Sequence, residues 1–556
     1  MLKYRAVIFL LAVLGDFQVY AAGSKVAIAS AHPLATAAGF EIIAKGGNVF
    51  DAAVAISATL AVVEPSGSGL GGGGYWLLHR ESDNFETMID GREKAPLAAY
   101  QAMYLDKAGK VTPRLSLDGA LAAAIPGLPA ALVHLSEKYG RLPLVDSLQP
   151  AIRAAQTGFA VGERYLKLLK FRAEVMKKHS ETAQIFLVDG DIPKAYSILR
   201  QPDLAHSLKQ LAGLGRNGFY DGEIAGKLVD AVNKAGGIWT KQDLAAYQIV
   251  EREPVKGNYR GIKITSAAPS SSGGIMLIEA LNILSGYDLK QVDELTRKHL
   301  IVEAMRRAYH DRALYLGDAD FIDIPVKRLL NDDYAAGLRS SLRSDRALSS
   351  TMLSGEIKSQ PEGINTTHFS IIDQEGNRVA ATLSINFPFG AGLVASGTGV
   401  LLNNQMDDFV ALPGAMNGYG LVGGVANAIT PGKRMLSSMA PTFLDDGHNV
   451  AVVGTPGGSR IISMVLLAAL DFAEGHPPNS WVQLPRFHHQ FMPDVLEYEK
   501  AALTFDELTG LAAMGHQLKE ARYSYGDMQA VQWNKITHEL TAASDHRGEG
   551  LAIVGH

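Results

Sequence analysis

The segment Asn365-Thr366-Thr367-His368-Phe369-Ser370 decides how the rest of the chain is interpreted. It leads into an apolar, strand-like run over residues 367–372, and a second such run covers residues 378–385. The intervening residues 373–377 have the composition of a turn, so the two runs predict a β-hairpin. Two interpretations are open. Either Thr366 merely opens an edge strand, which the segment alone favours, or the chain cleaves itself before Thr366.

Composition and charge limit the class of protein. The chain has 556 residues, which is enough for one large globular unit or a few domains, and 47% of them are apolar. The net charge is −5 without a long run of either sign, which argues against a nucleic-acid surface. Because there is no cysteine, disulfides, thiolate catalysis and cysteine-based metal sites are excluded.

Residues 1–22 have the pattern of a secretory signal peptide. Lys3 and Arg5 precede an apolar run over residues 6–15, which is shorter than the ~20 residues that a membrane-spanning helix needs. The alternative, an uncleaved membrane anchor, is disfavoured because Asp16 interrupts the run. We therefore expect an exported protein, periplasmic or secreted, with no membrane span once the signal is removed.

Apolar periodicity and turn residues predict a mixture of helices and strands after residue 22. Residues 340–363 are polar and predict a mobile linker that leads to the 365–366 bond, as a cleavable segment requires. The expected helices cover residues 37–45, 49–63, 119–124, 128–138, 148–157, 222–235, 275–284, 292–316 and 461–472. The expected strands cover residues 25–30, 75–79, 449–454, 495–498, 530–533 and 551–554.

Two further motifs suggest a binding site. The glycine-rich residues 64–74 are not a phosphate loop, since no Gly-Lys-Ser/Thr ends the motif and a strand follows it, so we expect a structural loop beside the site. Arg92 follows a strand-like run and a glycine, where its guanidinium can hold a carboxylate with two hydrogen bonds. For a lone arginine, a surface ion pair with Glu93 is the simpler alternative.

Taken together, these stretches resemble the γ-glutamyltransferase (γ-glutamyltranspeptidase) family, a branch of the N-terminal nucleophile hydrolases. The resemblance covers essentially the whole mature chain and is specific because six motifs occur in order: residues 64–74, 90–96, 366–370, 401–409, 436–439 and 454–460. It implies an α+β fold, the four-layer αββα sandwich. It also implies cleavage between Asn365 and Thr366, so that a heavy fragment (residues 23–365) and a light fragment (residues 366–556) form the fold jointly.

The resemblance implies transfer of the γ-glutamyl group of glutathione or related compounds to water, amino acids or peptides. The Thr366 hydroxyl would attack the γ-carbonyl and form an ester. A free α-amino group has a pKa of about 7.7–8.0, so after cleavage it can act as the general base on the same residue. An amide nitrogen is not basic, which explains why cleavage must come first. No cofactor and no metal are expected.

The resemblance also assigns residues to the two charged groups of the glutamyl end. Arg92 is expected to bind the carboxylate with the hydroxyls of Ser437 and Ser438. Asp408 is expected to bind the ammonium group, with further hydrogen bonds to Asn386 and Gln405. Because Arg92 lies in the heavy fragment and Asp408 in the light one, neither fragment alone should bind the substrate well.

The remaining assignments concern the reaction itself. Gly457 and Gly458 are expected to form the oxyanion hole with their backbone N–H groups, where one such donor is worth roughly 3–4 kcal/mol. Ser384 stands where the family often has threonine and is expected to hydrogen-bond Thr366, beside an intact Thr367. Tyr419 matches the gating aromatic of a lid over residues 413–424. The alternative for the lid is an ordinary glycine-rich surface loop.

Two other functions stay open at this point. One is an acylase of the same fold that removes glutaryl side chains from β-lactams. A glutaryl group has no amine, so the expected ammonium pocket around Asp408 argues against it. The other is a non-catalytic exported binding protein that never matures, against which the intact Thr366 and the glycines at 457–458 weigh.

Overall fold

The computed structural model describes residues 25–353, 366–412, 414–415 and 417–556. The expected signal peptide, residues 354–363 of the expected linker, and Asn365 lie outside these ranges. In the part of the chain that the structure describes, no helix is both long enough and apolar enough to cross a membrane.

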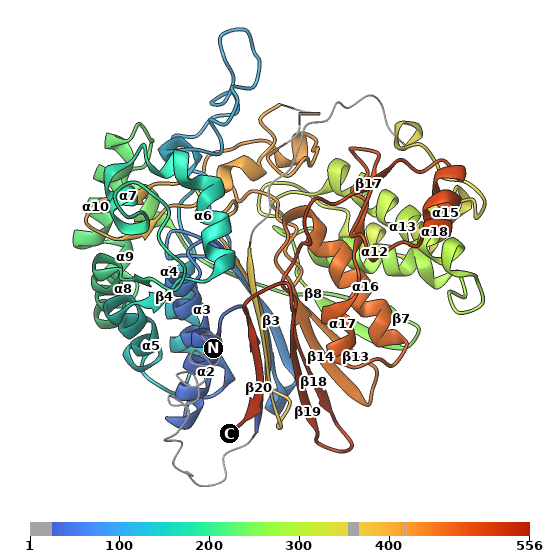
Figure 1. The fold of residues 1–556 in the computed structure, drawn as a ribbon, viewed down its shortest axis with the longest axis horizontal. Helices are drawn as coiled ribbons and strands as arrows, with labels where there is room; N and C mark the ends of the chain where they lie inside the picture. Colours follow the sequence, from blue (N-terminus) through green and yellow to red (C-terminus); the bar gives the residue numbers. More distant parts are fainter. Residues whose placement is uncertain (1–24, 354–365, 413, 416) are drawn as a thin grey trace.

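Two antiparallel sheets pack face to face at the centre of the described residues (Figure 1). The first contains, in spatial order, β20 (Leu551–Gly555), β1 (Val26–Ser30), β9 (Thr367–Asp373), β10 (Arg378–Ser384), β2 (Gly73–Arg80), β3 (Phe85–Gly91) and β6 (Val250–Arg252). The second contains β19 (Leu540–Ser544), β18 (Gln529–Asn534), β14 (Asn449–Gly454), β13 (Thr442–Asp445), β8 (Ile262–Ser266) and β7 (Val255–Tyr259).

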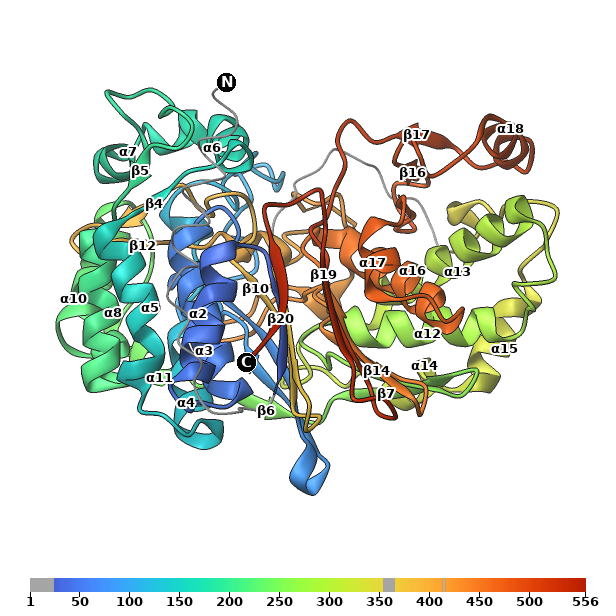
Figure 2. The same cartoon turned by 60° about the horizontal axis from the view of Figure 1, so that its bottom comes forward.

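Helices cover the outer face of each sheet, as Figure 2 shows. Against the first sheet lie α2 (Pro33–Ala44), α3 (Val49–Val63), α4 (Leu128–Tyr139), α5 (Leu144–Thr157) and, further out, α8 (Pro202–Leu214) and α10 (Gly222–Lys234). Against the second lie α12 (Gly273–Ser285), α16 (Ile461–Ala473) and α17 (Pro478–Gln483), and α13 (Glu294–Tyr315) packs on α12. The expected α+β, four-layer αββα sandwich is therefore confirmed.

The predicted hairpin places alternate side chains in two different cores. β9 pairs with β10 through the turn at residues 373–377, with His368 opposite Thr382. Phe369 and Ile371 face the helical layer around α3, which is buried along its whole length and capped by Asn48. His368 faces the other sheet instead, since successive residues of a strand point to opposite sides.

Most predicted elements have the expected bounds within a few residues, but the helix predicted over residues 119–124 is wrong. Only a short 3-10 turn, Ala120–Ala122, forms there. The carbonyl of Ala123 accepts a hydrogen bond from the Trp239 indole, and the Asn403 side chain bonds both the N–H and the C=O of Ala124. These tertiary contacts occupy the backbone groups that a helix would need.

The two halves of the sequence interleave within both sheets. β1, β2, β3 and β6 come from residues before 354, and β9, β10 and β20 come from residues after 365. In the second sheet only β7 and β8 come from the earlier half. Each half therefore has strands that pair with strands of the other half, and both sheet neighbours of β1 come from the later half.

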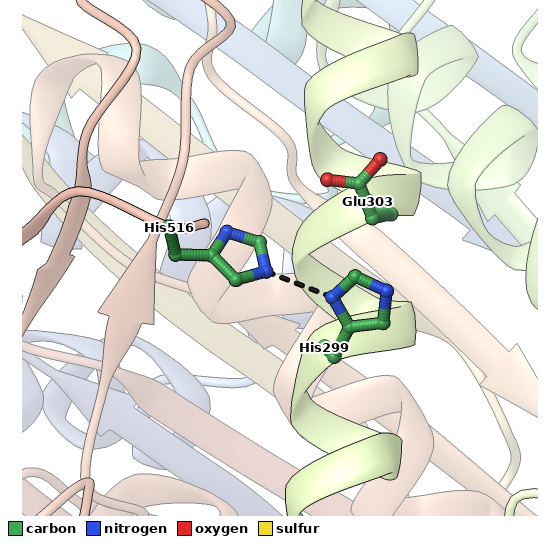
Figure 3. Close-up of side chains that lie close together, drawn as sticks. All are labelled: His299, Glu303 and His516. Atoms are coloured by element: carbon green, nitrogen blue, oxygen red, sulfur yellow. Dashed lines mark hydrogen bonds between the residues drawn. The ribbon is translucent and has the colours of Figure 1, made fainter. Parts of the chain in front are cut away.

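A buried cluster on α13 adds a further link between the halves (Figure 3). His299 Nε2 donates to the carbonyl of Arg343 (2.6 Å), so His299 Nδ1 accepts from His516 Nε2, 2.8 Å away. Glu303 lies near both rings, and the three side chains are close enough to share a cation. However, the Glu303 oxygens accept from Arg306 and Arg307, two charges that oppose a further cation. We interpret the cluster as a hydrogen-bonded link.

The two sheets are in close contact at Gly454 and His368. A Cβ atom on Gly454 would lie 2.3 Å from His368 Cε1. The His368 ring is held in place by Thr382 Oγ1 (2.8 Å) and Ser370 Oγ (3.1 Å). Burial lowers the pKa of His368 to about 3, so the ring is neutral near pH 7. The ring cannot move away without losing these hydrogen bonds.

We predict that Gly454→Ala lowers the stability by about 1–3 kcal/mol, as expected for overpacking a fixed core. The matched control is Gly213→Ala in α8, where a new Cβ meets no atom within 4 Å. That control should be neutral or slightly stabilising, because alanine favours helix. Thermal unfolding of both variants checks the prediction, and equal midpoints for the two would contradict it.

Candidate active site

A small cavity lies at the end of the sandwich where β9 begins and β10 ends. It brings together residues that are as far apart in sequence as 92 and 461. The site residues expected from the sequence that line it are Arg92, Thr366, Ser384, Asn386, Asp408, Tyr419, Ser437, Ser438 and Gly458. The structure thus collects most of the expected site in one place.

Thr366 lies at the base of this cavity, immediately before β9, and is 4% exposed. The backbone N–H of Gly457 donates a hydrogen bond to the Thr366 hydroxyl oxygen at 3.0 Å. Gly457 follows β14 and begins the 3-10 turn Gly458–Arg460. Acyl transfer requires backbone donors beside the oxyanion that forms next to the attacking oxygen, and the Gly457 N–H is fixed in that neighbourhood.

Gly458 and Tyr419 pack against each other over the cavity. Gly458 has a φ of +58°, and a Cβ there would lie 2.3 Å from the Tyr419 ring. The Tyr419 hydroxyl donates to the carbonyl of Asn386 at 2.9 Å. Only a glycine at 458 therefore allows the tyrosine to lie where it does.

The segment around Tyr419 is attached to the site by polar contacts. Asn417 Nδ2 donates to Asp408 Oδ1 (3.3 Å), and the N–H of Gly418 donates to Asp407 Oδ2 (2.7 Å). Burial raises the pKa of Asp407 to about 7. The expected lid thus contacts the cavity, and the sequence analysis did not identify Asp407 or Asn417.

Arg92 and Asp408 form an ion pair at the far side of the cavity, with Arg92 Nη2 2.5 Å from Asp408 Oδ2. Burial opposes the charge of Arg92, but Asp408 and Glu93 more than offset it and raise the pKa of the guanidinium. Burial also opposes the charge of Asp408 and raises the pKa of that carboxyl group, although the positive charge of Arg92 lowers it in part. The Gln405 amide serves both partners when its oxygen faces Arg92 Nη1 (2.6 Å) and its nitrogen faces Asp408 Oδ2 (3.2 Å).

The simpler interpretation of Arg92 as a surface cation is wrong, because the residue is only 1% exposed. Glu93 does lie near it, with 3.7 Å between Arg92 Nη1 and Glu93 Oε2, but Glu93 is also fully buried. Burial raises the pKa of Glu93 to about 7. The two side chains belong to the interior of the site.

Ser437 and Ser438 line the cavity beside this ion pair. Ser437 Oγ accepts from the N–H of Met439 (3.0 Å), and Ser438 Oγ accepts from Arg312 Nη2 (3.2 Å). Arg312 comes from α13 and lines the cavity as well. The apolar periodicity of this helix predicts a place in the core, but Arg312 cannot be distinguished by sequence from Arg306 and the other arginines on the same helix.

Ser384 and Asn386 hold each other at the end of β10. Ser384 Oγ accepts from the N–H of Asn386 (2.8 Å), and Asn386 Nδ2 donates to the carbonyl of Asn404 (2.9 Å). Asn386 has a φ of +74°, a conformation that asparagine tolerates better than most residues. The Ser384 hydroxyl is thus engaged with Asn386, and its expected hydrogen bond to Thr366 stays a prediction.

Thr367 points away from the cavity, because it follows Thr366 in the strand. Its buried hydroxyl lies beside Glu64, whose pKa is raised to about 8 by burial and by Asp527. Glu64 begins the glycine-rich loop, and a Cβ on Gly72 in that loop would lie 2.2 Å from the Ser384 carbonyl. The loop passes beside the site as expected, while a catalytic role for Thr367 stays a prediction.

Comparison with known proteins agrees with this geometry. The sequence model of the family described as Gamma-glutamyltranspeptidase matches residues 35–555. The glutathione hydrolase proenzyme of Escherichia coli (strain K12) is 42% identical over 536 residues, which cover 95% of this chain and 91% of that protein.

Two solved structures extend the comparison. A cephalosporin acylase from Bacillus halodurans has a TM-score of 0.83 at 27% identity and covers 97% of this chain, with 99% of its own chain matched. A γ-glutamyltranspeptidase from Helicobacter pylori has a TM-score of 0.57 at 39% identity, with 61% of this chain and 97% of that chain covered. With the match of the family model over nearly the whole sequence, these results show that the chain belongs to the γ-glutamyltranspeptidase family.

Proposed function

We propose that this protein is a self-cleaving γ-glutamyltransferase and glutathione hydrolase. The observation that carries the proposal is the Thr366 hydroxyl, held by Gly457 in a cavity that ends in a pair of opposite charges, Arg92 and Asp408. Such a cavity has a nucleophile at one end and recognition for a zwitterion at the other. A γ-glutamyl amide has matching groups, since its α-carbon carries an ammonium and a carboxylate three bonds from the reacting carbonyl.

In the proposed maturation step, the Thr366 hydroxyl oxygen attacks the carbonyl carbon of Asn365. The C–N bond breaks as the C–O bond forms, which gives an ester and a free α-amino group on Thr366. Water then hydrolyses the ester, so that Asn365 ends the heavy fragment (residues 23–365) and Thr366 begins the light fragment (residues 366–556). The hydroxyl is regenerated beside an amine that can accept its proton.

Substrate binding replaces one ion pair by two. The ammonium of the glutamyl group binds Asp408 with help from Gln405, while the carboxylate binds Arg92 and the seryl hydroxyls of Ser437 and Ser438. Leaving one partner of a buried ion pair unpaired costs about 3–5 kcal/mol. A ligand that carries both charges avoids this cost, and a ligand that carries only one does not.

The reaction then follows from the position of Thr366. Its hydroxyl attacks the γ-carbonyl, and the N–H groups of Gly457 and Gly458 stabilise the oxyanion. The α-ammonium group of Thr366 returns the proton to the leaving amine, and a threonyl ester remains. Water, an amino acid or a peptide then takes the glutamyl group. Tyr419 over the cavity limits the access of water, which favours transfer.

A glutaryl-type β-lactam acylase is the second candidate, and the high TM-score with the Bacillus halodurans cephalosporin acylase favours it. A glutaryl group would leave Asp408 without a cationic partner, because it has no amine. The carboxylate of Asp408 beside Arg92 therefore supports the γ-glutamyl substrate. We also propose that residues 1–22 direct export, which the N-terminal sequence of the secreted protein would test.

The proposed function is tested by Thr366→Ala. Without a hydroxyl neither the cut nor the transfer has a nucleophile, so the variant should give one band on a denaturing gel and no turnover of a γ-glutamyl anilide. Thr366→Ser keeps the hydroxyl and should give two bands. N-terminal sequencing of the smaller wild-type fragment should start at Thr366. An uncut variant that is still active would refute the role assigned to this residue.

Asp408→Asn tests the ammonium site. We expect kcat/KM for the γ-glutamyl anilide to fall about 100- to 1,000-fold, since the change removes one partner of a buried ion pair. For the corresponding glutaryl anilide, which lacks the amine, the change should be less than about tenfold. Parallel loss for both anilides would argue that Asp408 only maintains the fold, and processing into two bands serves as the folding control.

Gly458→Ala tests the packing of the lid. The new Cβ would overlap the Tyr419 ring, so we expect kcat/KM to fall at least tenfold and the ratio of hydrolysis to transfer to rise. In the double variant with Tyr419→Ala the clash is absent. The double variant should therefore resemble Tyr419→Ala alone, as a strongly non-additive pair. Additive losses would contradict the contact.

A further inference from the structure

Arg312 carries a buried charge without an acidic side chain in ion-pair contact, and the Asp408 carboxylate that acts on it from further away is already paired with Arg92. Arg312 is 5% exposed, and its guanidinium donates to neutral hydroxyls, from Nε to Ser272 Oγ (3.0 Å) and from Nη2 to Ser438 Oγ (3.2 Å). Among the described residues, no carboxylate lies within 4.0 Å of its guanidinium nitrogens. Arg306 and Arg307 on the same helix both pair with Glu303 instead.

The charge of Arg312 persists at neutral pH although the nearby carboxylate of Asp408 is shared with a second cation, Arg92. Burial lowers the pKa of Arg312 to about 10, which still leaves the guanidinium protonated. A buried cation without an anionic partner is unfavourable, so the site gains from a ligand that brings an anion. Arg92 gains less from an anionic ligand than Arg312 does, because Asp408 already neutralises the charge of Arg92.

The hydrogen bonds of Arg312 also fix the direction of Ser438. A guanidinium has only donors, so the Ser438 oxygen must accept, and its O–H remains free to donate. Ser272 accepts from Arg312 in the same way and donates its own O–H to the carbonyl of Ser437 (2.6 Å). Arg312 thus holds the Ser437–Ser438 segment through two paths, and the direct one leaves the Ser438 O–H free to donate at the cavity.

We propose that Arg312 is a positioning residue that makes the site select substrates with an α-carboxylate. It orients the Ser438 hydroxyl toward that carboxylate and supplies the positive charge that the Arg92–Asp408 pair lacks in the empty site. The inference rests on the proposed γ-glutamyl function and deepens it. The ligand class is an α-amino-acid carboxylate, bound by Arg92 and by the Ser438 hydroxyl that Arg312 orients.

The test measures KM and kcat with a γ-glutamyl anilide, and Ki for two competitive analogues. Glutaramate has the carboxylate without the amine, and 4-aminobutanamide has the amine without the carboxylate. For Arg312→Gln we expect KM and the Ki of glutaramate to rise about 10- to 100-fold, the range for a lost hydrogen bond to a charged group. The Ki of 4-aminobutanamide should change less than about threefold, and kcat should fall less than KM rises.

Arg312→Lys and Arg297→Gln serve as comparisons. Lysine keeps the charge but loses the fork that reaches two hydroxyls, so its KM should lie between those of the wild type and Arg312→Gln. Arg297 lies on the same helix and pairs with Glu474 far from the cavity lining, so its loss should leave all three constants unchanged. If Arg312→Gln fails to give two fragments on a gel, the lysine variant carries the test.

Each outcome has a separate meaning. Equal increases for both analogues, or unchanged constants, would overturn the role of Arg312, since a purely structural residue does not distinguish the carboxylate from the amine. A wild-type protein that does not turn over the γ-glutamyl anilide would overturn the proposed function itself. Selective loss of carboxylate binding in both Arg312 variants would support the inference.

Discussion

The hydrogen bond from Gly457 to the Thr366 hydroxyl joins the two sheets at the end where the cavity lies. Thr366 leads into β9 of one sheet, whereas Gly457 follows β14 of the other. The contact of Gly454 with His368 sets the spacing of these two strands just inside the site. The geometry of the proposed nucleophile therefore depends on the packing of whole sheets, and misplacement by about 1 Å can cost 100-fold in rate.

The charges of the cavity are arranged by the same packing. Arg92 and Arg312 come from the half of the chain before residue 354, and Asp408 and Ser438 come from the half after residue 365. Burial makes each isolated charge unfavourable, so the empty site pairs what it can and leaves Arg312 with hydroxyl partners only. A zwitterionic ligand supplies an ammonium group for Asp408 and a carboxylate for the arginines. The proposed specificity therefore follows from the cost of burying unpaired charges.

The sequence predicted the elements whose signal is local. α3 and β14 have the predicted bounds because an alanine-rich run with an Asn48 cap and a short β-branched run each specify one structure. The predicted helix at residues 119–124 failed because side chains distant in sequence bind its backbone. The site residues could be assigned only through the family resemblance, because the local sequence pattern at Thr366 favours an edge strand. Arg312 was missed because a sequence does not show which helical arginine lacks an acidic partner.

The interleaved strands also give a physical reason for a single precursor chain. β1 lies between β20 and β9, and β2 lies between β10 and β3, so strands from the two halves are hydrogen-bonded neighbours in the first sheet. Two separate chains would have to form these pairs by association, which costs an estimated 4–15 kcal/mol in lost translational and rotational freedom. One chain avoids that cost. Because Thr366 and Gly457 meet only after both sheets have packed, the proposed cut follows folding, and only a folded chain acquires the terminal amine that the reaction uses.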